Sequence, residues 1–143
     1  MKTIALRFGE HFAPECGTIA AHQEVIDQYG FVWYGKMGVP ISEQIKKEIL
    51  SNDKPKLLLI RSGKIERYWA FVAEIQRIMP DKRMIPEYYR NDVDKFKSWF
   101  KITCFEKAPK DVLLHCKVSS SGRPLSEVSK HSMSPYFKIE CND

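Results

Sequence analysis

Residues 56–78 read KLLLIRSGKIERYWAFVAEIQRI, two apolar segments separated by a Ser-Gly-Lys turn. The unbroken Leu-Leu-Leu-Ile run in the first segment, residues 55–63, is typical of a strand buried on both faces. Residues 67–78 alternate as a second strand does, with one face predicted to carry Trp69, Phe71, Ala73 and Ile75 and the other Tyr68, Ala70, Val72 and Glu74. Two strands joined by so short a turn form a hairpin, which predicts a mixed or antiparallel sheet.

Two helices and two strands are predicted on the N-terminal side of this hairpin. Residues 2–9 alternate as a strand, and residues 19–29 repeat apolar side chains at helical spacing between Thr18, a predicted N-cap, and Gly30. Residues 31–35 form a second strand, with Phe31 and Trp33 facing one way. Ser42 is placed to cap a helix over residues 43–52, whose inward side chains are Ile41, Ile45 and Ile49.

The C-terminal half of the chain is predicted to be rich in strands. After an irregular segment over residues 79–97, strands are expected at residues 98–106 and 111–118. A polar turn, a short helix after Pro124 and a closing strand at residues 136–140 follow. The fold class is therefore α+β: a small curled mixed β-sheet or pseudo-barrel of about five to seven strands, with two flanking helices and a short C-terminal helix. The length fits one domain over residues 1–143.

Charge and hydropathy narrow the choice of partner. The net charge of +5 and the sequence pI near 9.0 are compatible with a polyanion such as nucleic acid. No apolar run approaches the roughly 20 residues that span a bilayer. The N-terminal residues lack the apolar core of a signal peptide, because Arg7 and Glu10 interrupt it. A cytoplasmic location and no membrane partner are expected, and the oligomeric state is left open.

Motifs for common cofactors and for common nucleophiles are absent from the sequence. It contains no Gly-rich nucleotide-binding loop, no H-E-x-x-H and no G-x-S-x-G. The four cysteines show no C-x-x-C spacing, so no metal site or cofactor is expected and the thiols are predicted to stay reduced. Glu74 is the one carboxylate within an apolar strand. It lies on a solvated face or, if it faces a cavity, acts as a base.

His22 lies on the apolar stripe of the first helix, beside Ile19, Ile26 and Tyr29. It is either a hydrogen-bonded core histidine or a residue that lines a pocket near Trp33, because only Gly30 separates the helix from the next strand.

Aromatic and basic side chains alternate through much of the chain. Aromatic rings stack on bases while Lys and Arg neutralise phosphates, so this combination favours nucleic-acid binding. Tryptophans in strands more often fill a core, and both interpretations stay open for Trp33 and Trp69. The residues concerned are Trp33, Tyr34, Tyr68, Trp69, Tyr88, Tyr89, Trp99, Lys36, Arg61, Lys64, Arg67, Lys82, Arg83 and Arg90.

In its order of elements the chain resembles the PUA-like superfamily, and especially its EVE and YTH-type domains. Three features carry the resemblance: the strand-helix-strand opening that leads to VWYGK (residues 32–36), the central hairpin, and the C-terminal SGRPLSEVSKHSMSPYFKIE (residues 121–140). The resemblance implies a curled barrel that binds DNA or RNA without catalysis. It also implies an aromatic-walled pocket for one flipped or modified base.

The resemblance and the pattern of aromatic and basic residues together indicate which residues would form the site. The expected base pocket is Trp33, Tyr34, Trp69, His22, Ser62, Ser119, Ser120 and Ser121. The expected phosphate contacts are Lys36, Arg61, Arg67, Arg83, Arg90 and Arg123. Two alternatives remain open: a hydrolase of modified nucleosides similar to ASCH-type relatives, with Glu74 or His22 as base, and a protein-interaction module of a phage or defence system.

Overall fold

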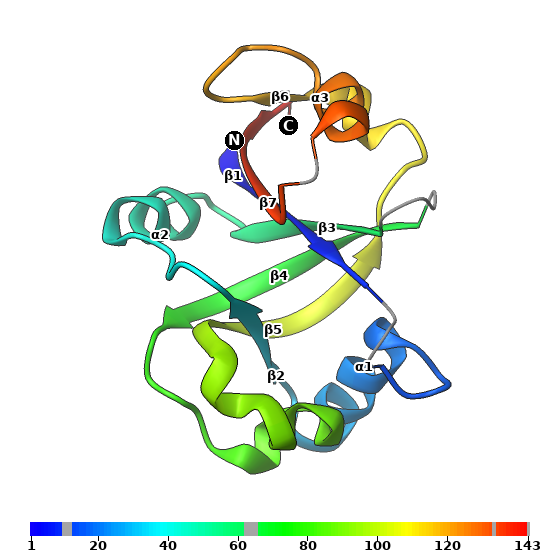
Figure 1. Cartoon of the computed structure of the whole chain (residues 1–143), viewed down its shortest axis with the longest axis vertical. Helices are drawn as coiled ribbons and strands as arrows, with labels where there is room; N and C mark the ends of the chain where they lie inside the picture. Colours follow the sequence, from blue (N-terminus) through cyan, green and yellow to red (C-terminus); the bar gives the residue numbers. More distant parts are fainter. Residues whose placement is uncertain (10–12, 62–65, 133, 143) are drawn as a thin grey trace.

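A computed structural model describes residues 1–9, 13–61, 66–132 and 134–142 of the chain. These residues form an α+β fold around one mixed sheet, with the strand order β2-β5-β4-β3-β1-β7-β6 (Figure 1). Strands β1 and β3 run parallel, whereas the other neighbouring strands run antiparallel. The α+β prediction is confirmed. The strands are β1 Lys2–Phe8, β2 Val32–Met37, β3 Lys56–Arg61, β4 Arg67–Gln76, β5 Phe96–Lys107, β6 Cys116–Val118 and β7 Tyr136–Cys141.

The helices begin and end close to where the sequence predicts. Gly30 ends the first helix in the left-handed conformation, with φ of 86°, and Ser42 Oγ accepts a hydrogen bond from the Ile45 N–H at 3.2 Å. Thr18 differs from its prediction, because Gly17 occupies the cap position and Thr18 is the first helical residue. The helices are α1 Thr18–Tyr29, α2 Glu43–Leu50 and α3 Leu125–His131, and the 3₁₀ segments are η1 Lys82–Met84, η2 Glu87–Lys95 and η3 Val112–His115.

Strand β3, the first strand of the central hairpin, is buried on both faces, as predicted. Leu57 and Leu59 belong to the main core, whereas Leu58 and Ile60 belong to a second core on the opposite face of β3. Strands β3 and β4 pair antiparallel up to Ile60 and Arg67. The predicted Ser62-Gly63-Lys64 turn lies outside the described residues.

A bulge in β4 changes which side chains share a face. The register with β5 steps from Val72–Ile102 to Glu74–Lys101, so Ala73 has no opposite residue. An inserted residue reverses the alternation beyond it. Ile75 therefore packs in the main core with Ala70 and Val72, and the predicted grouping of Ile75 with Trp69 and Phe71 is wrong.

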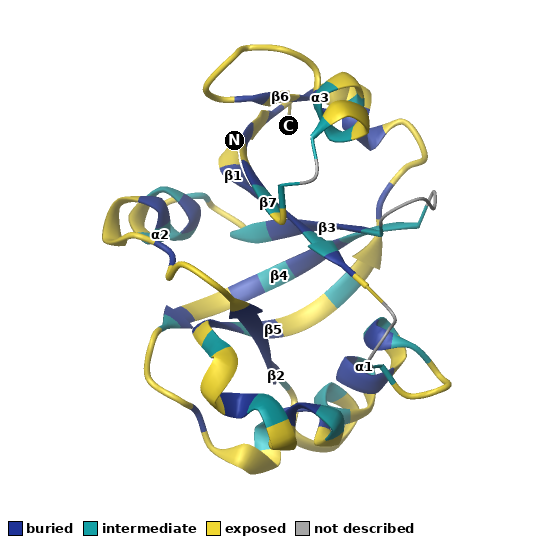
Figure 2. Cartoon of the chain, viewed as in Figure 1, coloured by how far each residue is buried: buried dark blue, intermediate teal, exposed yellow. Residues whose placement is uncertain are grey.

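The main core lies within the curl of the sheet. It contains apolar side chains from β1 through β5 and from α2, and side chains of α1 pack against it (Figure 2). Among the described residues, β1 and β2 contribute to this core without pairing with each other. The sheet therefore curls far enough to bring β2 towards β1 but does not close through hydrogen bonds.

A third core contains only aromatic and branched apolar side chains. Trp33 and Trp99 pack there with Ile85, Tyr89 and Val93. The last three come from residues 79–97, where an irregular segment is predicted and the structure places η1 and η2. This core fixes η2 against the outer face of β2 and β5.

Residues 111–118 depart from their prediction. Instead of one strand they form η3, in which Val112 and Leu113 are buried, followed by the short strand β6. A single strand would place Val112 and Leu113 on opposite faces, whereas a turn of 3₁₀ helix buries both in the second core.

The cysteines also depart from their prediction. Cys116 of β6 and Cys141 of β7 are directly opposite in the sheet and form a disulfide, although all four thiols are predicted to be reduced. Cys16 and Cys104 are free and exposed. The pairing joins residues 25 apart in sequence, and only the sheet register brings them together.

Candidate functional site

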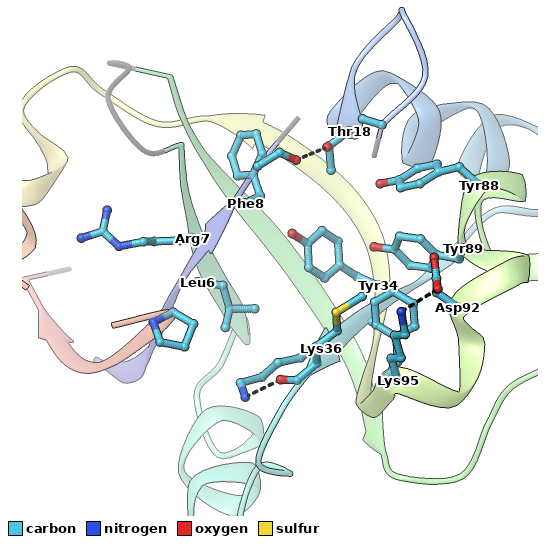
Figure 3. Close-up of a pocket in the computed structure, with 16 residues that line it drawn as sticks. Leu6, Arg7, Phe8, Thr18, Tyr34, Lys36, Tyr88, Tyr89, Asp92 and Lys95 are labelled. Atoms are coloured by element: carbon cyan, nitrogen blue, oxygen red, sulfur yellow. Dashed lines mark hydrogen bonds and ion pairs between the residues drawn. The ribbon is translucent and has the colours of Figure 1, made fainter. Parts of the chain in front are cut away.

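A cavity of about 520 Å³ lies where β1 and β2 face each other (Figure 3). Residues 6–9 of β1 and its extension form one wall, and residues 34–37 of β2 form the opposite wall. Segment η2 and the start of β5 close a third side with Tyr88, Tyr89, Asp92, Lys95 and Phe96. Its volume is in the ordinary range for small-molecule sites.

Gly35 makes room for one wall of the cavity. A Cβ on Gly35 would lie 2.5 Å from Cδ1 of Phe96, closer than carbon atoms can approach. The Phe96 ring therefore lies directly over the backbone of β2. It stacks on Tyr89 with a centroid distance of 4.5 Å and an interplanar angle of 29°. The glycine in VWYGK thus serves close packing of an aromatic wall.

Five aromatic side chains surround the cavity, so it is best suited to a flat ligand that stacks on their rings. Tyr34, Tyr88 and Tyr89 approach from β2 and η2 with their hydroxyls directed towards β1, where Phe8 faces them (Figure 3). Phe96 completes the set. Aromatic faces of this kind hold flat heterocycles, and each base–aromatic stack contributes about 1–3 kcal/mol to binding.

His22 stands behind this wall and is fully buried. Its ring lies 4.7 Å from the ring of Tyr34, Nδ1 lies 2.7 Å from the Thr18 carbonyl oxygen, and Nε2 lies 2.8 Å from the Tyr89 hydroxyl. Burial lowers the pKa of His22 to about 4, so the ring is neutral at pH 7. Burial also holds the pKa of Tyr89 well above its ordinary value, so its hydroxyl keeps its proton.

The two predicted tryptophan walls lie elsewhere. Trp33 is 7% exposed in the third core and Trp69 is 8% exposed in the second core, so the two rings share no cavity. Of the predicted base-pocket residues, Tyr34 lines the cavity and His22 lies behind it. Ser62 is outside the described residues. The exposed serines 119–121 follow β6 and do not line the cavity.

The predicted phosphate contacts are dispersed, and most of them have protein partners. Lys36 lines the cavity through its side-chain stem, and burial lowers its pKa. Its ammonium group donates to the carbonyls of Met37 and Val39. The Arg67 guanidinium donates to the Lys110 carbonyl. Three of the arginines form ion pairs with nearby acidic residues: Arg61 with Glu66, Arg83 with Asp81, and Arg123 with Glu127.

Arg90 is a predicted phosphate contact on the segment that forms one wall of the cavity, although it does not itself line the cavity. It is exposed on η2, next to the wall residue Tyr89. Lys95 adds an exposed cation to the same segment and pairs with Asp92 at 3.0 Å. Arg61 instead borders a more polar pocket of about 780 Å³ near the start of α1.

Sequence reasoning missed Phe8, Asp92 and Phe96 as lining residues. It included Tyr88 and Tyr89 in the aromatic set but did not place them in the pocket. The available signal was EYYRNDVDKF, residues 87–96, which combines aromatic, charged and amide side chains without a strand pattern. Loops and short helices that carry such residues are frequent binding elements.

The groups considered for catalysis lie outside the cavity. Glu74 is exposed and pairs with Lys101 at 3.6 Å, which corresponds to the solvated-face interpretation. His22 does not line the cavity. Within the described part of the chain no group of histidines, cysteines and carboxylates could hold a metal ion.

Comparison with known protein families assigns the fold. The profile of the family described as Pua-like matches residues 4–134, and the chain therefore belongs to the PUA-like family. Searches of curated proteins and of solved structures each found no significant match. None of the helices that the structure describes is both long and apolar enough to cross a membrane.

Proposed function

We propose that this PUA-like protein, acting as one domain over residues 1–143, binds nucleic acid without catalysis. One base, turned out of its strand, enters the cavity between β1 and β2. The observation that carries this proposal is the ring of five aromatic side chains around that cavity. Bases become accessible to such walls only when they are unstacked. The narrower resemblance to EVE and YTH-type domains supports a modified base as the preferred ligand.

Charge supports a polyanionic ligand. The chain carries a net charge of +5, and Arg90 and Lys95 are exposed on the segment that forms one cavity wall. These cations are suited to the phosphates that flank an inserted base. The hydrolase alternative lacks similar support, because Asp92 is the one carboxylate among the described lining residues and is held by Lys95.

Fluorescence anisotropy tests the proposal on single- and double-stranded DNA and RNA, plain and base-modified. We expect affinity for the preferred strand to fall roughly tenfold between 50 and 200 mM salt, since two or three phosphate contacts release counterions. Tyr88→Ala removes one half-buried wall and should weaken binding by roughly 5- to 150-fold, the equivalent of one stacking contact.

Tyr29→Ala is the matched control, because Tyr29 is exposed at the end of α1 and does not line the cavity. Circular dichroism verifies that both variants fold. The proposal would be contradicted by an affinity that does not change with salt concentration. It would also be contradicted by equal losses of affinity in Tyr88→Ala and Tyr29→Ala. The hydrolase alternative is tested by incubating modified nucleosides with the protein and separating the products by chromatography. Hydrolysis of a nucleoside would favour that alternative.

A further inference from the structure

Lys36 is a charged side chain that lies almost entirely inside the protein. It is 8% exposed, and burial lowers the pKa of its ammonium group. The ammonium donates to the carbonyl oxygens of Met37 at 3.2 Å and Val39 at 2.9 Å, and it lies 4.7 Å from the centroid of the Tyr136 ring. An ammonium has three N–H donors, so two carbonyls and one ring face account for all of them.

The contact between the Lys36 ammonium and the Tyr136 ring crosses the open side of the sheet. Lys36 lies on β2 at one end of the strand order, whereas Tyr136 lies on β7, which pairs with β1. Leu6 is opposite Tyr136 in that pairing and lines the cavity together with Pro135. Figure 3 shows the Lys36 side chain extending away from Tyr89. We call this contact the closing contact, because it joins β2 to the β1–β7 pair without a ladder hydrogen bond.

The hydrogen bonds of Lys36 also fix the end of β2. Gly38 has a φ of 79° and begins the connection to α2, and the two carbonyls that Lys36 binds lie on either side of it. Three residues beyond Gly38, the Ile41 N–H donates to Oγ of the buried Ser98 at 2.8 Å. The backbone around the lining residue Met37 is therefore held by buried polar side chains.

We propose that Lys36 is a positioning residue, which closes the open side of the curled sheet and holds the two walls of the cavity at a fixed separation. Its stem forms part of the cavity wall, and its ammonium binds the protein instead of a phosphate. Wider separation would weaken stacking, because dispersion contacts decline steeply with distance. The role in binding rests on the proposed function, whereas the closing contact is testable without a ligand.

NMR of the protein labelled with ¹⁵N-lysine tests the closing contact. A buried, hydrogen-bonded ammonium exchanges its hydrogens slowly with water, so we expect a protected Lys36 signal that is absent from Lys36→Met. Tyr136→Leu keeps an apolar side chain but removes the ring, so the signal should shift as the ring current is lost. The inference is overturned if no protected signal is found, or if Tyr136→Leu leaves the signal where it was.

Fluorescence anisotropy tests the role of Lys36 in binding. The probes are single- and double-stranded DNA and RNA, plain or carrying N6-methyladenine or 5-methylcytosine. Lys36→Met retains most of the stem and should weaken binding roughly 2- to 30-fold, the equivalent of one desolvated cation–π contact. The slope of log affinity against log salt concentration should stay unchanged. Lys117→Met is the matched control, because Lys117 is an exposed strand lysine at the opposite edge of the sheet.

Each other outcome of the binding experiment has a distinct meaning. A salt slope smaller by about 0.9 on duplex DNA, or about 0.7 on a single strand, would show that Lys36 contacts a phosphate and overturn the inference. Unchanged affinity in Lys36→Met would overturn it as well. If Lys36→Met fails to fold, Tyr136→Leu replaces it and should show the same loss at an unchanged slope. If the wild type binds no oligonucleotide, the proposed function fails, and the ammonium signal still decides whether the closing contact exists.

Discussion

At the scale of single residues, His22 links the stability of the fold to the cavity wall. The side chain is fully buried, and both ring nitrogens have hydrogen-bond partners in the neutral form. A proton on Nε2 would face the Tyr89 hydroxyl, which would then have to turn its own proton elsewhere. Protonation of His22 therefore disturbs packing and hydrogen bonding at once.

This arrangement predicts how stability depends on pH. Burial lowers the pKa of His22 from 6.5 to about 4, so as the pH falls the unfolded chain binds the proton first. The contribution of His22 is complete above pH 6.5 and is lost between pH 6.5 and about 4. Urea unfolding should give a free energy of unfolding about 2 kcal/mol lower at pH 5 than at pH 7.5 from this residue.

His22→Gln supplies the comparison, because the amide does not titrate. Its free energy of unfolding is expected to be lower than that of the wild type at pH 7.5, since the ring packing is lost. Its further decrease to pH 5 should be about 2 kcal/mol smaller than in the wild type. Equal decreases in the two proteins would show that His22 is not buried in its neutral form.

The burial of His22 could be predicted from its place on the apolar stripe of the helix. The identity of its hydrogen-bond partner could not. Tyr89 is 67 residues further along the chain, and no local pattern connects the two. Several ion pairs are easier to predict from the sequence, because their partners are close along the chain. Arg83 and Arg123 have acidic partners two and four residues away, which makes them poor candidates for phosphate contacts.

At the scale of elements, the alternation of apolar and polar residues predicts where strands lie but not where a bulge shifts their register. The bulge in β4 arises from its pairing with β5, and nothing in residues 67–78 indicates the inserted Ala73. Segment η2 shows the same limitation. Its residues contribute to both the third core and the cavity, yet its short 3₁₀ turns lack the periodicity that identifies a helix.

The pairing of β6 with β7 leads to a prediction about redox conditions. The disulfide between Cys116 and Cys141 restricts the unfolded chain, so reducing it should lower the free energy of unfolding by about 3.5 kcal/mol for a 25-residue separation. Urea unfolding with and without dithiothreitol measures this difference.

The two free cysteines provide the control for that measurement. A variant with Cys16→Ser and Cys104→Ser changes only exposed thiols and should show the same dependence on dithiothreitol as the wild type. Identical unfolding curves with and without the reductant would mean that the bond contributes nothing to stability.

At the scale of the whole molecule, the function proposed here depends on incomplete closure of the sheet. Strands β1 and β2 both pack on the main core, and the cavity occupies the place where their ends face each other. The curled sheet could be predicted from the hairpin and the order of elements. The position of the cavity could not, because it depends on how far the sheet curls and on where η2 packs.

Base insertion between β1 and β2 is tested most directly by methyl NMR of the protein labelled with ¹³C-methyl methionine. Met37 lines the cavity, whereas Met1 packs against the second core, away from the cavity lining. During titration with the oligonucleotide that binds most tightly, we expect a large shift of the Met37 methyl signal and little change at Met1, because an inserted base brings its ring current into the cavity. A saturable complex in which the Met37 signal does not move would contradict base binding between β1 and β2.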